Sequence, residues 1–246
     1  MPGIHSNLPS YLLNNSFSIV INKIPVLIGI PESKFSVKDK FPWILWMHGR
    51  TANKEIDPGR YLRLLRNGIG FCAVDLPGHG ERSNSLKDDP SATLDIIKQM
   101  SSEIDYVFEW VVENTKLDSN RSAVGGMSAG GMAAIDRLVK PHSFKATALE
   151  ATTGNWEAQS LRPMFSKIPK DVIKSNSPIH NLENWTPLSI IAVHSIKDEW
   201  IDYAGQKKFI DKLKEINLNK EIKFISYGKN WSTLRTYRIW KKISRK

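Results

Sequence analysis

Gly126-Met127-Ser128-Ala129-Gly130, followed by Gly131, lies between a predicted strand at 121–125 and a predicted helix that starts at Ser128 and runs to about Val139. A serine between small residues at a sharp strand-to-helix turn has the form of a nucleophile elbow, where the two backbones pass too close for larger side chains. The alternative is a glycine-rich turn with an incidental serine. Because a strand and a helix flank the pentapeptide, we favour the elbow.

The rest of the sequence predicts the sheet around this turn. Apolar runs of strand length alternate with longer segments of helical period, which is typical of an α/β protein with a mostly parallel sheet covered by helices on both faces. We predict eight strands, at 17–21, 24–30, 43–47, 70–74, 121–125, 145–149, 188–193 and 221–227, the first two forming an antiparallel hairpin. Amphipathic helices are predicted at 91–115, 128–139 and 203–216.

The domain organisation follows from length and from one irregular segment. At 246 residues the chain is predicted to form a single domain, 1–246. The segment 152–185 lacks a clean period, and we predict a short cap insertion over the strand ends. Its candidate contacts for an acyl group, with core packing as the alternative for at least half of them, are Trp156, Met164, Phe165 and Trp185.

Composition narrows the class of protein. Apolar residues make up 41% of the chain and charged residues 24%, as in soluble globular proteins. No apolar run approaches the roughly 20 residues of a membrane helix, and the N-terminus lacks the pattern of a secretory signal, so we expect a cytoplasmic location. The single cysteine, Cys72, excludes an internal disulfide. Without metal-ligand spacing or a phosphate loop, no cofactor and no metal site are expected.

The net charge of +10 raises the question of an anionic partner. Much of the excess lies in an atypical basic tail at 229–246, which holds seven basic residues and no acidic one. A basic helix at 234–246 that contacts nucleic acid or anionic lipid is one reading of the tail, and packing on the sheet as a final helix is the favoured one. We therefore expect neither nucleic acid nor membrane as a partner, and the oligomeric state is not predicted.

Three further segments carry residues suited to chemistry. They are His48-Gly49-Arg50-Thr51 after the third predicted strand, Asp75-Leu76-Pro77-Gly78-His79-Gly80-Glu81-Arg82 after the fourth, and His194-Ser195-Ile196-Lys197-Asp198-Glu199-Trp200 at the end of the seventh. Together with the elbow, these segments resemble in order and spacing those of the α/β-hydrolase superfamily. By motif the chain is most similar to the dienelactone-hydrolase, acetyl-esterase and prolyl-oligopeptidase-like branches.

This resemblance implies an α/β-hydrolase fold and a serine hydrolase. The expected reaction is carboxylesterase-type hydrolysis of a small ester, or of a thioester or amide, through an acyl-serine intermediate. Ser128 is the implied nucleophile and Asp198 the implied acid of a catalytic triad. Glu199 is the second choice for the acid, and a pair of solvated loop charges is the alternative for both.

The oxyanion hole is expected to use two backbone N–H groups. Ala129 follows the nucleophile at a helix N-terminus, where unpaired N–H groups and a positive dipole end favour an oxyanion. The resemblance implies that the second donor lies in the loop after the third strand, as the N–H of Gly49, Arg50 or Thr51. His48 in that loop is interpreted as structural.

One element of the implied triad is missing from the sequence. The family places its catalytic histidine after the last strand, but no histidine follows His194. The six histidines all have structural or surface interpretations: His5, His48, His79, His142, His180 and His194. Because an unassisted serine hydroxyl is a poor nucleophile, losing the base costs on the order of 10⁶ in turnover, although binding and the oxyanion hole retain roughly 10³ to 10⁴ over water.

Two hypotheses account for this loss. In the first, the chain is a pseudo-hydrolase that keeps the fold and binds a ligand or partner. In the second, which we favour, residues 229–246 are the product of a frameshift or truncation, because the acid-free composition begins where the histidine loop is expected. Translation of the coding DNA in its other two frames beyond Tyr227 tests the second hypothesis.

Overall fold

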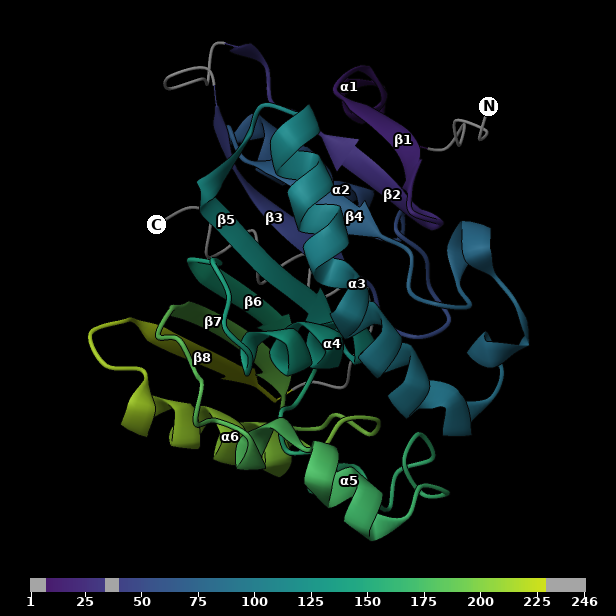
Figure 1. Ribbon diagram of the computed structural model, residues 1–246, viewed down its shortest axis with the longest axis vertical. Coiled ribbons are helices and arrows are strands. Elements are labelled where there is room, and N and C mark those ends of the chain that lie inside the picture. Colours follow the sequence, from purple (N-terminus) through teal and green to yellow (C-terminus); the bar gives the residue numbers. More distant parts are fainter. Residues whose placement is uncertain (1–7, 34–39, 229–246) are drawn as a thin grey trace.

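A single sheet of eight strands organises residues 8–33 and 40–228, the part of the chain that the computed structural model describes (Figure 1). The strands are β1 (Ser16–Ile21), β2 (Ile24–Gly29), β3 (Phe41–Met47), β4 (Gly70–Val74), β5 (Leu117–Met127), β6 (Ala146–Glu150), β7 (Ser189–Ser195) and β8 (Ile222–Tyr227). Their order across the sheet is β1-β2-β4-β3-β5-β6-β7-β8. β2 pairs antiparallel with β1 and β4, whereas the pairs from β4 to β8 run parallel. The predicted mostly parallel sheet is confirmed.

The hairpin that opens the sheet has a tight turn. Asn22 and Lys23 both have positive φ, 46° and 67°. Positive φ at both central residues is the geometry of a type I′ turn, whose twist matches that of the strands it joins. The hairpin therefore forms where the sequence predicted it.

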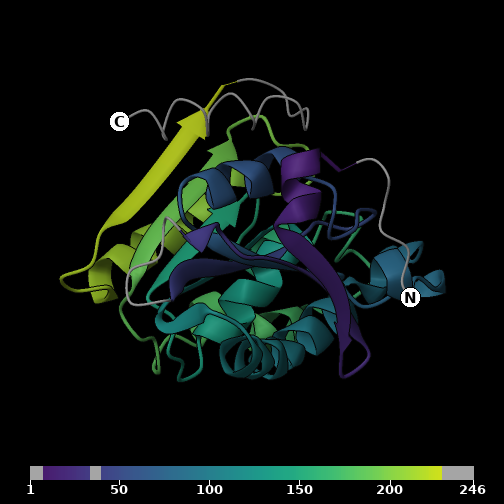
Figure 2. The ribbon, with the colours of Figure 1, turned by 90° about the horizontal axis from the view of Figure 1, so that it is seen from above.

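Helices cover both faces of the sheet (Figure 2). One face carries α1 (Ser10–Asn14) and α2 (Pro58–Arg66), and the other carries α3 (Thr93–Asn114), α4 (Ala129–Leu138) and α6 (Tyr203–Ile216). The last three agree with the predicted helices to within a few residues. The sequence analysis did not predict α1, α2 or the short α5 (Lys170–Asn176).

Each face of the sheet has its own apolar core. The larger core packs alternate side chains of the central strands, including Trp43 and Leu45, against α3 and α4. The smaller core packs Trp46 and Phe71 against α2, where Tyr61 stacks on Phe71 with ring centroids 4.4 Å apart. This burial fixes the strands whose carboxyl ends carry the candidate site.

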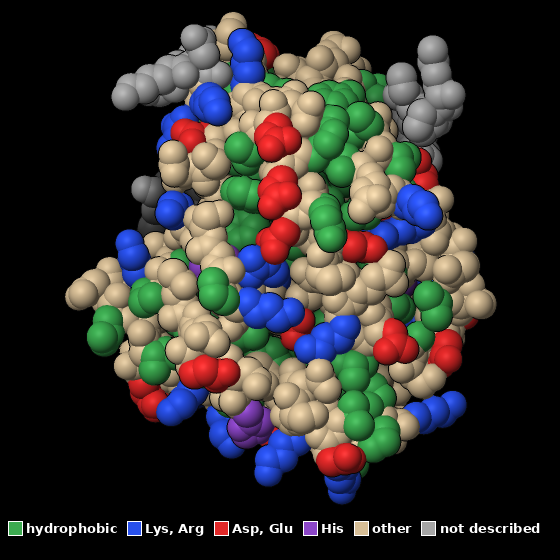
Figure 3. Space-filling view, viewed as in Figure 1, with side chains coloured by type: hydrophobic (Ala, Val, Ile, Leu, Met, Phe, Trp, Pro, Cys, Tyr) green, Lys and Arg blue, Asp and Glu red, His purple; other side chains and the backbone are tan. Residues whose placement is uncertain are grey.

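The segment between β6 and β7 lies beside α6. It contains two turns of 3-10 helix, η5 (Trp156–Gln159) and η6 (Pro178–His180), on either side of α5. The space-filling view shows acidic and basic side chains interspersed on the face that carries α3 (Figure 3). The single-domain organisation stays a prediction, and the basic tail at 229–246 lies outside the described residues. No helix in the described ranges has the length and apolar character needed to cross a membrane.

Candidate active site

Ser128 lies on the turn between β5 and α4. Its backbone angles, φ of 52° and ψ of −119°, fall in a region that residues other than glycine rarely adopt. The backbone holds this conformation because the Ser128 N–H donates to the Glu150 carbonyl at 3.0 Å, and the Ser128 carbonyl accepts from Met132 N–H at 2.9 Å. The Thr152 hydroxyl donates to the same carbonyl at 2.8 Å. The turn has the geometry that the sequence predicted for a nucleophile elbow.

Two glycines let the backbones meet at this turn. A Cβ on Gly126 would lie 2.5 Å from the Gly130 carbonyl carbon and 2.6 Å from the Met47 oxygen. A Cβ on Gly130 would lie 2.5 Å from the same Met47 oxygen. The carboxyl ends of β3 and β5 and the first turn of α4 are therefore in backbone contact. This contact places the loop after β3 beside Ser128.

The loop after β3 contains the candidate second oxyanion donor. A Cβ on Gly49 would lie 3.3 Å from the Ser128 Cβ, so the backbone of Gly49 is next to the serine side chain. Thr51 in the same loop has a φ of 62°. Ala129 is the first residue of α4, and its N–H has no carbonyl partner within the helix. The predicted donors thus come from two segments that flank Ser128.

The Arg50 side chain joins this loop to the segment that precedes α3. Its guanidinium donates to the carbonyls of Asp89 at 2.9 Å and Lys87 at 2.5 Å and to the Thr93 hydroxyl at 2.5 Å. A further hydrogen bond reaches the Leu86 carbonyl at 3.3 Å. Arg50 therefore fixes the backbone of residues 86–89 relative to the loop after β3.

Buried hydrogen bonds of His48 and Asp75 hold the loop after β3 in place. His48 Nδ1 hydrogen bonds to the Gly49 carbonyl at 2.6 Å, and its Nε2 accepts from Leu76 N–H at 3.0 Å. Burial lowers the pKa of His48 to about 4, so the ring is neutral at pH 7. The buried Asp75 carboxylate accepts from Lys54 Nζ at 3.2 Å and from Glu81 N–H at 3.0 Å. His48 is thus held as a structural residue, in agreement with its interpretation from the sequence.

Asp198 is held by the loop that follows β7. Its Oδ1 accepts from the N–H groups of Trp200 and Ile201, both at 2.9 Å. Its Oδ2 lies 3.6 Å from His194 Nε2, which also hydrogen bonds to the Ile201 carbonyl at 3.2 Å. Burial lowers the pKa of His194. The implied acid therefore has a fixed position.

Ser128 and Asp198 line one pocket of about 720 Å³. Its wall also includes Gly49, Arg50 and Glu199, all singled out from the sequence, but not Ala129, which is fully buried beside Ser128. A cavity of this volume is in the range that holds small organic ligands. The structure brings the two predicted catalytic side chains to the same cavity.

No histidine of the described residues lines this pocket. His79 is buried and bonds to the Pro77 carbonyl at 2.8 Å, and His180 pairs with Glu157. His142 lies against Phe144, with ring centroids 6.0 Å apart. His5 and the segment after Gly228 lie outside the described residues. The base implied by the family is not supplied by the described wall of the pocket.

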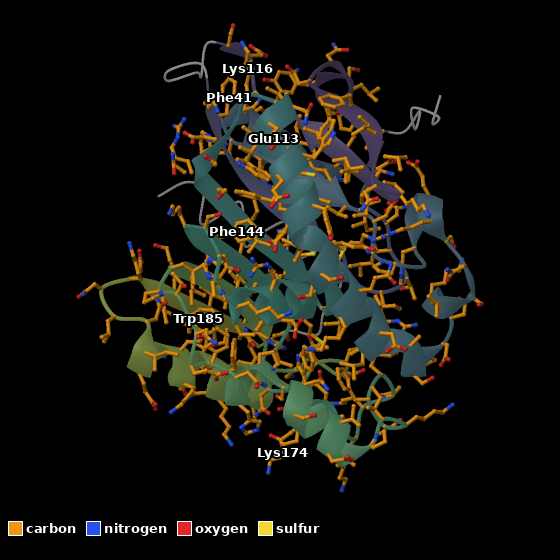
Figure 4. The ribbon with its side chains drawn as sticks, in the orientation of Figure 1. Phe41, Glu113, Lys116, Phe144, Lys174 and Trp185 are labelled. Atoms are coloured by element: carbon orange, nitrogen blue, oxygen red, sulfur yellow. The ribbon has the colours of Figure 1, made fainter. Side chains whose placement is uncertain are left out.

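The predicted acyl contacts divide unevenly. Met164 lines the pocket. Trp156 and Phe165 are fully buried. Trp185, labelled in Figure 4, hydrogen bonds to Asn217 at 3.1 Å in the core. Of these four side chains Met164 alone lines the cavity, and the other three are buried in the larger apolar core.

Sequence reasoning missed two features near Ser128. Trp200 lines the pocket, but the sequence analysis assigned it no role. Arg60 forms a buried ion pair with Glu150 at 2.6 Å beneath the elbow, and its guanidinium lies 3.9 Å from the centre of the Trp46 ring. The Asp57-Pro58 pair was the available signal, since it caps α2 and so places Arg60.

The sheet order and the turn at Ser128 are those of the α/β-hydrolase fold, the fold of many serine hydrolases. The chain belongs to the prolyl oligopeptidase family, whose model matches residues 60–231. An esterase of Escherichia coli, YjfP, is 28% identical over 160 residues, which cover 62% of this chain and 61% of the esterase. The aligned region therefore spans less than two thirds of that relative.

Solved structures share the fold. TT1662 from Thermus thermophilus superposes with a TM-score of 0.71 at 17% identity, covering 94% of this chain and 96% of that one. Dipeptidyl peptidase 4 of Porphyromonas gingivalis gives 0.72 at 16% identity, over 94% of this chain and 35% of that one. Esterase 2 of Thermogutta terrifontis, in a form phosphoramylated by tabun, gives 0.68 at 13% identity, with 93% of each chain covered. At these identities the likeness concerns the fold.

Proposed function

We propose that this chain is a carboxylesterase-type serine hydrolase that acts on small esters through an acyl-Ser128 intermediate. The observation that carries the proposal is the strained turn at Ser128, which faces one pocket together with the fixed carboxylate of Asp198 and the backbone of Gly49. Backbone strain of this kind is typical of functional positions. The similarity to an esterase supports an ester as the substrate.

In the proposed reaction the Ser128 oxygen attacks the ester carbonyl carbon. The negative charge moves to the carbonyl oxygen, where the N–H groups of Ala129 and of Gly49 or Arg50 stabilise it. No histidine of the described residues lines the pocket, so the serine proton passes to a base from solution, and then to the leaving alcohol as the acyl-oxygen bond breaks. Water then attacks the acyl-serine in the same way and releases the carboxylic acid. The Asp198 carboxylate lines the same pocket, where it would stabilise a protonated base.

The base itself limits the expected rate. Since no histidine follows His194 in the sequence, turnover should be low, and an added small base should raise it. We expect imidazole to increase the hydrolysis of para-nitrophenyl acetate by wild type and not by Ser128→Ala, once the rate with imidazole and no protein is subtracted from both. An equal increase in both proteins would show that imidazole acts without the serine.

A fluorophosphonate probe tests the nucleophile directly. Wild type should label faster than Ser128→Ala, because the probe reacts with a serine whose oxyanion is stabilised. Labelling no faster than in Ser128→Ala, with and without imidazole, would reject the enzyme. It would favour the second candidate, a pseudo-hydrolase that binds a ligand in the same pocket, which the missing histidine supports.

A further inference from the structure

The strongest unexplained feature of the pocket is the Trp200 indole. Eight large apolar side chains of the described residues are strongly exposed, and Trp200 is the one among them that lines the pocket of Ser128. It is 65% exposed. Scattered exposed apolar side chains are common on protein surfaces. An exposed indole in the wall of a candidate active site is a surface that a ligand can cover.

The backbone around Trp200 is fixed on both sides. Its N–H donates to Asp198 Oδ1 at 2.9 Å, and the next residue, Ile201, is buried. The preceding carbonyl, that of Glu199, accepts from the Arg162 guanidinium at 2.6 Å. The backbone at Trp200 is therefore held in place, and a ligand has only the two side-chain torsions of the indole to order.

Other apolar groups line the pocket close to Trp200. Pro163, Met164 and Ile201 are part of its lining, and the hydrogen bond from Arg162 to the Glu199 carbonyl joins the segment that carries Pro163 to the loop that carries Trp200. The charged residues that line the pocket are Arg50, Lys87, Asp88, Lys197, Asp198 and Glu199. The Arg50 guanidinium already donates to backbone carbonyls, so fewer of its N–H groups are left to bind a ligand. The lining thus offers an apolar area as well as a polar one.

We propose that Trp200, with Pro163 and Met164, forms a subsite for a medium-length alkyl or aryl group of the substrate. This inference rests on the proposed function in taking the ligand to be an ester. The subsite selects esters that carry one extended apolar group over acetate-sized esters. Met164 supplies an adaptable side chain and Trp200 a flat one, a combination that accepts both alkyl and aryl groups.

Binding of unreactive ketones tests the subsite without turnover. Methyl hexyl ketone and acetone are titrated calorimetrically into Ser128→Ala protein, and into the same protein carrying Trp200→Ala or Trp200→Phe. Covering roughly 60 Å² of apolar indole corresponds to about tenfold in affinity. We expect methyl hexyl ketone to bind more tightly than acetone, Trp200→Ala to weaken it about tenfold, and Trp200→Phe to retain most of the affinity.

Tyr106→Ala is the matched control, since Tyr106 is similarly exposed, at 58%, but lies on α3 outside the pocket lining. It should leave ketone binding unchanged. An unchanged affinity in Trp200→Ala, or no preference for methyl hexyl ketone over acetone, would overturn the subsite. Ketone binding that depends on Trp200 in a chain that fails to label with fluorophosphonate would reject the enzyme and support the subsite.

Discussion

The ion pair beneath the elbow should be necessary for stability. Arg60 and Glu150 are 7% and 2% exposed, and their side chains meet at 2.6 Å. Arg60→Met removes the cation and leaves the Glu150 carboxylate in a low-dielectric site. Breaking a buried pair on one side costs about 3–5 kcal/mol, which is a large part of the roughly 5–15 kcal/mol that stabilises a typical protein.

The surroundings favour the lower end of that range. Asp57, 3.0 Å from Arg60, loses the same partner, but its side chain is 30% exposed, so water screens that loss. A cavity of about 70 Å³, lined by Trp46, Met127 and the pair itself, can admit water to the remaining carboxylate. We therefore expect a loss of about 3 kcal/mol in Arg60→Met, equal to a fall of roughly 6–12 °C in Tm for a chain of this size.

Urea unfolding followed by tryptophan fluorescence measures this loss. The control is the double variant Arg60→Met/Glu150→Met, in which neither charge is buried alone and most of the stability should return. Arg60→Met within 1 kcal/mol of wild type, on the scale of a surface pair, would refute the reasoning. So would a double variant less stable than the single one. Because the Glu150 carbonyl accepts the Ser128 N–H, fluorophosphonate labelling should fall in the single variant as well.

Three other outcomes are expected. Gly130→Ala should abolish soluble expression or lower Tm sharply, because its Cβ would lie 2.5 Å from the Met47 oxygen. Gly228→Ala, whose Cβ would lie 3.6 Å from the nearest atom of the described residues, should be close to neutral in thermal unfolding. Arg50→Met should speed amide hydrogen exchange across residues 86–89 and slow fluorophosphonate labelling. Normal protection of this segment would argue against the hydrogen bonds from Arg50 to it. The free energy of unfolding should fall as the pH drops from 6.5 toward 4, because His48 binds a proton near pH 6.5 in the unfolded chain and only near pH 4 in the folded one. The fall attributable to His48 is at most about 3 kcal/mol. A His48 ring that titrates above pH 5.5 in the folded protein by NMR would contradict this.

The sheet was predictable because its signals are local. Strand-length apolar runs, the Asn22-Lys23 turn and the Gly126 to Gly130 spacing each act within a few residues of sequence. The helix α2 was missed because only nine residues form it, and it buries Arg60 together with Tyr61 and Leu65. A buried arginine interrupts the apolar pattern by which a short helix is recognised.

The candidate site was predictable in part for the same reason. Ser128 and Asp198 follow strands in a fixed chain order, and the parallel sheet brings the ends of those strands to one edge. The Arg60–Glu150 pair joins residues 90 positions apart, so no local sequence pattern predicts it. Trp156 and Phe165 were candidates for the pocket because aromatic residues suit both a core and a ligand, and only packing distinguishes the two.

At position 128 the backbone conformation favours glycine, whereas the proposed reaction needs a serine hydroxyl. At a φ of 52° a serine raises the free energy of the folded chain by about 1–3 kcal/mol, and glycine would avoid this strain. Glycine in turn makes the unfolded chain more flexible, which costs roughly 0.5–1 kcal/mol of stability. A related protein that no longer needs the serine hydroxyl would therefore be more stable with glycine at this position. The neighbouring glycines have no such freedom, because Gly126 and Gly130 touch backbone. Residue 128 is therefore where relaxed selection in related sequences would be seen first, as serine gives way to glycine while the flanking glycines persist.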